Sequence, residues 1–216
     1  EELVEYRLRT TRDKVNEAIA GFESSCASAG ISATVIQEEG DPFQLMTSCA
    51  RYHDLTIFGL RSLFEFGIVN EPPHELERLV HGGVRPLLAI EKEYRPIRRV
   101  MIAYSGSTES AKTMRQFVRM SPWKDLHLSI IVFEGSAVNG QRLLDDAGAY
   151  CRSYGYSPDL SFVPRSAKDY LLQEAAKWQA DLLVLGNSAG NLLLRRVFGE
   201  TALHVMATSD RSLFLS

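Results

Sequence analysis

Short apolar runs alternate with amphipathic runs of helical length along the second half of the chain. The apolar runs predict five strands, at residues 99–104, 126–133, 160–163, 182–185 and 213–215. The runs between them predict four helices, at residues 108–120, 141–154, 167–179 and 199–207. Strands that are apolar throughout, separated by helices, are typical of a parallel sheet with helices on both faces. We therefore predict an open α/β fold with right-handed crossovers.

The chain also repeats itself. ARYHDLTIFG, at residues 50–59, matches AKWQADLLVLG, at residues 176–186. At the same offset, within one residue, residues 83–90 match residues 209–216, and residues 30–36 match residues 156–163. Three matched segments in the same order indicate two homologous units. We place the first unit at residues 1–94 and the second at residues 95–216.

The first unit starts with a predicted helix at residues 2–29, which aligns with the helix at residues 141–154. Nothing upstream of it corresponds to the strand, helix and strand of residues 99–133. A central strand cannot be left out of such a sheet without exposing backbone edges and apolar faces. We expect that roughly 40 residues of the first unit are absent from this sequence. The alternative is a half-domain completed by another chain.

Composition narrows the class of protein. Of the 216 residues, 45% are hydrophobic and 24% are charged, as in ordinary globular proteins. The net charge of −3 provides no field to attract nucleic acid or an anionic membrane. Cys26, Cys49 and Cys151 are odd in number and form no CxxC, so we expect reduced thiols in a cytoplasmic protein. No residues have metal-ligand spacing, and we predict no metal site.

The segment DLLVLGNSAGNLLLRRVFGETALHVM, at residues 181–206, carries the candidate chemistry. A predicted strand ends at Gly186, a loop contains Gly190, and Gly199 opens the last helix. Glycines allow a backbone to approach a ligand, and the free N–H groups of a helix start attract anions. This layout can hold phosphates, although glycines at strand ends also serve simple turns.

The same segment resembles the nucleotide signature of the universal stress protein family, G-x2-G-x9-G followed by Ser or Thr. Gly186 and Gly199 have the spacing of its outer glycines, whereas Ala189 replaces the middle one and Glu200 occupies the Ser/Thr position. With the order of the elements and the YSGS turn at residues 104–107, the chain resembles a tandem universal stress protein. The resemblance implies a five-stranded parallel α/β sheet of the adenine nucleotide alpha hydrolase type. It also implies a homodimer or an intramolecular pseudo-dimer, and in some members bound ATP or AMP.

The resemblance also implies a crevice at the carboxyl ends of the strands in the second unit. Its predicted residues are Ala103, Tyr104, Ser105, Ser107, Val132, Leu185, Gly186, Asn187, Ala189, Gly190, Gly199, Glu200 and Thr201. We expect at least one of Val132 and Phe133 to belong to the core instead. Ser105 lacks the charge of the family's Asp, and the Glu200 carboxylate near a phosphate costs roughly 1–3 kcal/mol. ATP or AMP should therefore bind weakly, and changing Glu200 to Ser should tighten ATP more than adenosine.

The first unit has no corresponding glycine at its helix start, where Pro72 and Pro73 stand instead, so we assign it no nucleotide site. The preceding insertion, at residues 60–69, is apolar, with Leu63, Phe64 and Phe66 among its residues. Such a loop is more easily accommodated at an interface between the units, or between chains, than in water.

No catalytic constellation stands out, so we expect a binding or signalling protein without efficient turnover. The resemblance implies that it acts in the stress response. One alternative is a universal stress protein that binds no nucleotide and acts through an unidentified protein partner. A further alternative is an ATP pyrophosphatase-like enzyme, because SGSTES, at residues 105–110, is similar to the SGGxDS loop of that class. There Ser107 replaces the second glycine, and Glu109 replaces the Asp.

Overall fold

The computed structural model describes residues 2–38, 40–59, 84, 86–91, 93–186, 201, 204–205, 209 and 211–216. They divide into two compact units, Glu1–Gly40 and Asp41–Ser216, and each is described by itself. The boundary predicted between residues 94 and 95 lies inside the second of these units and stays a prediction.

The unit Glu1–Gly40 is built on one helix, α1 (Glu2–Ser28). The chain leaves it through Gly30, whose φ of +67° is the left-handed conformation that glycine adopts readily. Residues 31–38 then form neither helix nor strand, although residues 30–36 match a strand of the second half. Ile31 and Ile36 are 60% and 54% exposed. A strand needs a neighbouring strand to pair with, and this segment pairs with none among the described residues.

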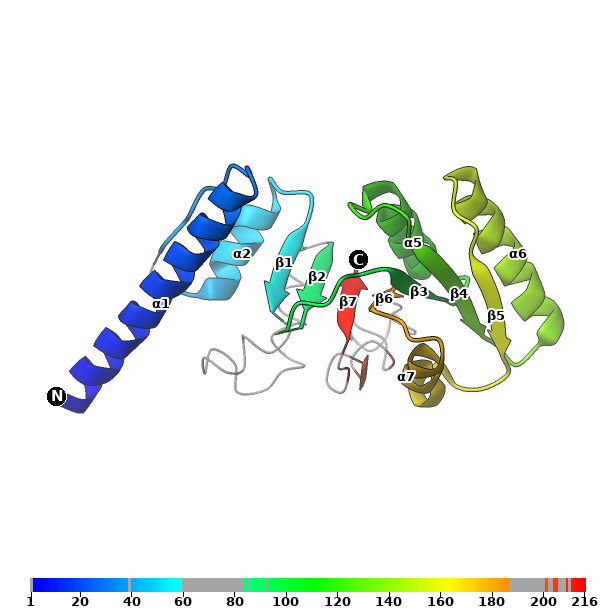
Figure 1. The fold of residues 1–216 in the computed structure, drawn as a ribbon. Coiled ribbons are helices and arrows are strands. Elements are labelled where there is room, and N and C mark those ends of the chain that lie inside the picture. The colour runs from blue at the N-terminus through cyan, green and yellow to red at the C-terminus, as the bar shows by residue number, and fades with distance from the viewer. Residues whose placement is uncertain are drawn as a thin grey trace. The chain divides into compact units, whose positions relative to one another are not determined.

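The unit Asp41–Ser216 contains a seven-stranded sheet in the order β1-β2-β7-β6-β3-β4-β5 (Figure 1). The strands are β1 (Thr56–Gly59), β2 (Leu87–Ile90), β3 (Arg99–Tyr104), β4 (His127–Phe133), β5 (Asp159–Val163), β6 (Leu182–Leu185) and β7 (Ser212–Leu215). All neighbouring strands are parallel except β2 and β7, which are antiparallel. The predicted α/β fold is confirmed. The five predicted strands are those from β3 to β7, and the antiparallel pairing extends their sheet to seven strands.

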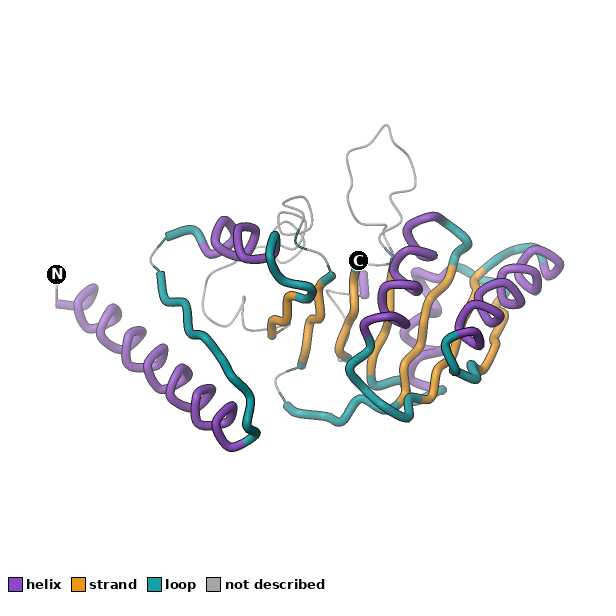
Figure 2. The backbone as a smooth tube through the Cα atoms, turned by 90° about the horizontal axis from the view of Figure 1, so that it is seen from above, coloured by secondary structure: helices purple, strands orange, loops and turns teal. Residues whose placement is uncertain are grey.

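Helices cover both faces of this sheet (Figure 2). On one face, α5 (Thr108–Met120) and α6 (Ala137–Ser153) contribute Met114, Phe117 and Leu144 to a buried cluster with alternate residues of the strands. On the other face, α2 (Pro42–Ala50) and α7 (Ala167–Lys177) contribute Phe43 and Leu171 to a second cluster. The central strands β7, β6, β3 and β4 are largely apolar on both sides because both of their sides are buried.

Helix starts follow from local capping. The prediction for α5 is confirmed at both ends, and its N-cap is Ser107, as its position before the helix indicates. The helix α6 begins at Ala137 rather than at residue 141, because Ser136 caps it by accepting from the Asn139 N–H at 3.4 Å. The helix α2 was not predicted, although Asp41 before Pro42 is a strong start signal.

The matched segments pair in the same register. Thr56 lies opposite Leu87 in β1 and β2, and the corresponding residues Leu183 and Leu213 lie opposite each other in β6 and β7. The two matched strand pairs, β1 with β2 and β6 with β7, meet where β2 pairs with β7 in antiparallel orientation. Within the described residues, no helix is long and apolar enough to cross a membrane.

Candidate functional site

The turn after β3 is closed by its own serines. The Oγ of Ser105 lies 3.1 Å from the Oγ of Ser107 and 3.2 Å from that of Ser110. The Ser110 N–H donates to the Oγ of Ser107 at 3.1 Å, which caps α5. Gly106 has a φ of +74°, and a Cβ atom there would lie 2.5 Å from Leu143. The hydroxyl of Ser105 is therefore engaged inside the loop.

Gly186, which follows β6, meets the start of α5. A Cβ atom at this position would lie 2.4 Å from the Cα of Ser110 and 2.7 Å from its backbone nitrogen. Real Cβ atoms do not approach backbone so closely. The glycine therefore allows the end of β6 and the first turn of α5 to touch.

A small pocket of about 80 Å³ opens where these elements meet. Its lining comes from the carboxyl ends of β3, β4 and β6 and from the starts of two helices: Ala103, Tyr104, Ser105, Ser110, Phe133, Ala167, Leu185, Gly186 and Thr201. In the sheet, β3 lies between β4, the next strand of the chain, and β6, a later strand. The strand order therefore reverses its direction at β3, which makes this a topological switch point. Open α/β sheets bind ligands at such a switch point, outside the carboxyl ends of the strands.

The structure brings together several residues that the sequence predicted for the crevice. Six of them line the pocket: Ala103, Tyr104, Ser105, Leu185, Gly186 and Thr201. Ser107 supports the loop without lining the pocket. Val132 is fully buried in the core, and its neighbour Phe133 is the residue that lines the pocket. As expected, one of these two belongs to the core.

Other predicted residues lie outside the described part of the chain: Asn187, Ala189, Gly190, Gly199 and Glu200, together with the insertion at residues 60–69 and Pro72 and Pro73. The sequence-based prediction missed two lining residues, Ser110 and Ala167. Ser110 closes the SGSTES motif, and Ala167 opens the helix after β5. Both residues follow the carboxyl end of a strand, and this position in the sequence could have identified them as lining residues.

The described lining of the pocket carries no charged side chain. Burial raises the pKa of Tyr104, and the Asp146 carboxylate raises it further against the opposing effect of Arg142 and Arg115. The Tyr104 hydroxyl therefore stays neutral well above neutral pH. Among the described residues, no group of three His, Cys, Asp or Glu side chains is placed to hold a metal ion. The described lining offers hydroxyls, backbone groups and apolar surface.

No protein-family model matches the chain. The comparisons with curated sequences and with solved structures both find universal stress proteins. Universal stress protein Slr1230 of Synechocystis sp. is 21% identical to it over 203 residues, which cover 93% of this chain and 71% of that protein. Among solved structures, a universal stress protein from Archaeoglobus fulgidus DSM 4304 matches with a TM-score of 0.70 and 17% identity, covering 94% of this chain and 76% of the other.

A structure from Pseudomonas aeruginosa UCBPP-PA14 matches with a TM-score of 0.64 at 15% identity, covering 93% of this chain and 77% of the other. Both structural likenesses concern the fold. The similarity in sequence extends over nearly the same share of the chain. The resemblance to the universal stress protein family is therefore confirmed, since the chain is similar in sequence to one of its members and has the α/β fold of another.

Proposed function

We propose that this chain binds an adenine nucleotide weakly in the pocket at the carboxyl ends of β3 and β6, and that it serves stress signalling without turnover. The supporting observation is the position of the pocket. It lies at the switch point of the sheet and is lined by the serine turn after β3 and by Gly186 after β6.

The lining suits a base better than a phosphate chain. Tyr104, Phe133 and Leu185 offer aromatic and apolar surface, and the hydroxyls of Ser105 and Thr201 offer hydrogen-bonding groups. Phosphates would find no cationic side chain among the described lining residues. Because each phosphate adds negative charge that these residues do not neutralise, affinity should fall from adenosine or AMP to ATP.

A second candidate is a universal stress protein that binds no nucleotide and acts through a protein partner. Two observations favour it. The hydroxyl of Ser105 is already engaged with Ser107 and Ser110, and the pocket measures only about 80 Å³. A ligand would have to displace these contacts or widen the pocket.

Calorimetry with adenosine, AMP and ATP on matched variants tests the proposal. Ala167, at the first position of α7, lines the pocket, whereas Ala137, at the first position of α6, is exposed and lies outside it. Ala167→Trp should weaken binding at least about ten-fold by filling the pocket, and Ala137→Trp should leave it unchanged.

Equal binding by both variants would place the ligand elsewhere. No binding by the unmodified chain, with no adenine compound released on denaturing the purified protein, would support the second candidate. Steady ATP consumption in stoichiometric excess, lost in Ala167→Trp, would contradict the absence of turnover and favour the pyrophosphatase-like alternative.

A further inference from the structure

The serine turn, residues 105–110, uses the hydrogen-bond donors of its lining residues, Ser105 and Ser110, within itself. The Ser110 hydroxyl donates to the Ser107 carbonyl at 3.0 Å, and the Ser110 N–H donates to the Ser107 Oγ at 3.1 Å. The Ser105 N–H donates to the Ser110 Oγ at 3.3 Å. The single hydroxyl proton of Ser105 has two acceptors, the Oγ atoms of Ser107 at 3.1 Å and of Ser110 at 3.2 Å. Neither lining serine therefore has an N–H or O–H group left for a ligand.

The turn still has an acceptor to offer. A hydroxyl oxygen carries one proton and two lone pairs. The Ser105 Oγ accepts from the Ser107 N–H at 3.4 Å, which occupies one lone pair. When its proton is donated to the Ser107 Oγ, its second lone pair is open, and Ser105 is an exposed residue on the pocket wall. The pocket thus meets an acceptor without a donor on this side.

Close packing holds this arrangement in place. Ser110 is 3% exposed, and a Cβ atom on Gly186 would lie 2.4 Å from its Cα. At the other end of the turn, a Cβ atom on Gly106 would lie 2.5 Å from the side chain of Leu143 in α6. The turn therefore has little room to rearrange and release a donor.

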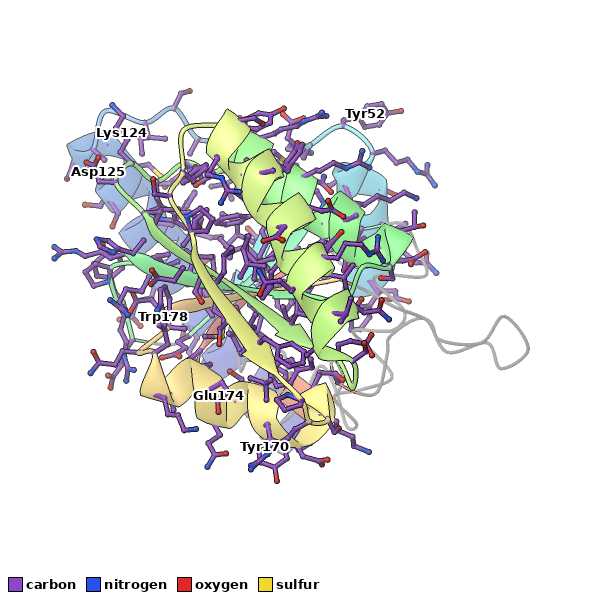
Figure 3. All side chains as sticks on the ribbon, turned by 90° about the vertical axis from the view of Figure 1, so that its right-hand side faces the viewer. Tyr52, Lys124, Asp125, Tyr170, Glu174 and Trp178 are labelled. Carbon is purple, nitrogen blue, oxygen red and sulfur yellow. The ribbon has the colours of Figure 1, made fainter. Side chains whose placement is uncertain are left out.

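Within the described residues, no cationic side chain of the lining makes up for these donors. Arg165 stands two residues before Ala167, which lines the pocket, but Arg165 is not among the described lining residues. Its guanidinium lies 4.7 Å from the centre of the Tyr170 ring of α7, a residue labelled in Figure 3. This cation is thus held on an aromatic ring of the helix rather than at the pocket wall.

We infer that the serine turn selects ligands by a hydrogen-bond donor, an N–H or O–H group that meets the Ser105 Oγ, and disfavours ligands that present only an acceptor there. The inference rests on the proposed function, because it takes the ligand to lie in this pocket. An acceptor placed against the Ser105 oxygen loses its bond to water and gains none, whereas a donor is satisfied. In an adenine nucleoside the donor has two sources, the amino group of the base and the hydroxyls of the sugar.

Calorimetry with analogues that replace one donor by an acceptor identifies the source. Inosine carries an oxygen in place of the amino group of adenosine. The 2′-fluoro and 3′-fluoro analogues each carry fluorine in place of one sugar hydroxyl. The analogue that lacks the donor at Ser105 should bind at least about ten-fold more weakly than adenosine, and the others should stay within about three-fold. Analogues that all bind like adenosine would overturn the inference.

Two variants of similar shape test the role of Ser105 itself. Ser105→Asp presents only acceptors, whereas Ser105→Asn adds N–H donors, and both remove the same hydroxyl. The loss of about ten-fold should persist in Ser105→Asp and shrink to within about three-fold in Ser105→Asn. A purely structural role of the turn would affect both variants alike. A loss of the same size in both would show that another group recognises the donor, and would overturn the inference.

A pair of ring fragments separates the inference from the proposed function. Pyrrole presents an N–H donor, whereas furan has nearly the same shape and presents an oxygen. In NMR titrations of the intact 216-residue protein, pyrrole should shift the amide signals of residues 105–110 at least about three times as much as furan.

When adenosine binds, the analogue series and the Ser105 variants decide. When adenosine does not bind, the nucleotide proposal is wrong, and the fragments decide. A larger effect of pyrrole then supports the donor-selective turn, whereas equal shifts from the two fragments, or none from either, would overturn it.

Discussion

A Cβ atom on Gly186 would lie 2.4 Å from the Cα of Ser110, so the end of β6 and the first turn of α5 touch through their backbones. Both residues line the pocket. The contact joins segments that are far apart in the sequence and sets how closely the two sides of the switch point approach.

Gly186→Ala should lower the free energy of unfolding by about 1–3 kcal/mol, because the added methyl group must push one backbone away from the other. Urea denaturation measures the loss. Gly135→Ala is the matched control, since nothing lies within 4 Å of a Cβ there, and it should change stability by less than about 0.5 kcal/mol. Equal effects of the two changes would show that the contact is not tight in solution.

Ser107→Ala should lower the free energy of unfolding by about 1 kcal/mol, because the capping hydrogen bond to the Ser110 N–H is lost. Ser166 also stands at an N-cap, that of α7, but makes no side-chain capping bond. Ser166→Ala should therefore cost clearly less in the same denaturation experiment. If Ser166→Ala costs as much as Ser107→Ala, the capping bond is not the source of the difference.

Asp181→Ala should lower the free energy of unfolding by about 1–3 kcal/mol, because the amides of Arg98 and Arg99 lose their acceptor. Its counterpart Asp54 has no such partner among the described residues, so Asp54→Ala should change stability by less than about 0.5 kcal/mol. Thermal or urea unfolding of the two variants makes the comparison. A similar loss in both would mean that Asp54 already has a structural role.

Cys151 should make stability fall at alkaline pH. Burial raises the pKa of its thiol from 9.0 to about 11, against a smaller opposite effect of Arg152. The contribution of this group is complete below pH 9, the unfolded value, and is lost as pH rises towards 11, because only the unfolded chain releases the proton there. Comparing the protein with Cys151→Ala from pH 8 to 11 isolates the effect, and parallel curves would contradict it.

Local patterns predicted most of the second half of the chain. The strand β3 and the helix α5 have their predicted bounds, and the cap at Ser107 was readable from its position before an amphipathic run. The pocket turn and Gly186 were also predicted, because ligands of parallel sheets gather at the carboxyl ends of strands. These features depend on periodicity and on neighbours in the sequence.

The remaining features depend on residues far apart in the sequence. Residues 30–36 resemble a strand but form none, because a strand exists only beside a partner. Val132 and Phe133 are neighbouring apolar residues, and the sequence did not show which of them faces the core. Side chains alternate along β4, and the packing of the helices decides that Val132 lies in the core and Phe133 lines the pocket.

By itself, then, the sequence determined the parallel α/β class and many element bounds, since these follow from hydrophobic period, capping and chain order. The crevice at the carboxyl ends of the strands was predicted from the family resemblance. Only the tertiary structure decided the antiparallel pairing of β2 with β7 and the engagement of the Ser105 hydroxyl. Each of these features depends on contacts between residues that are far apart in the sequence. A hydrogen bond or a buried apolar contact stabilises the fold only when both of its partners are present.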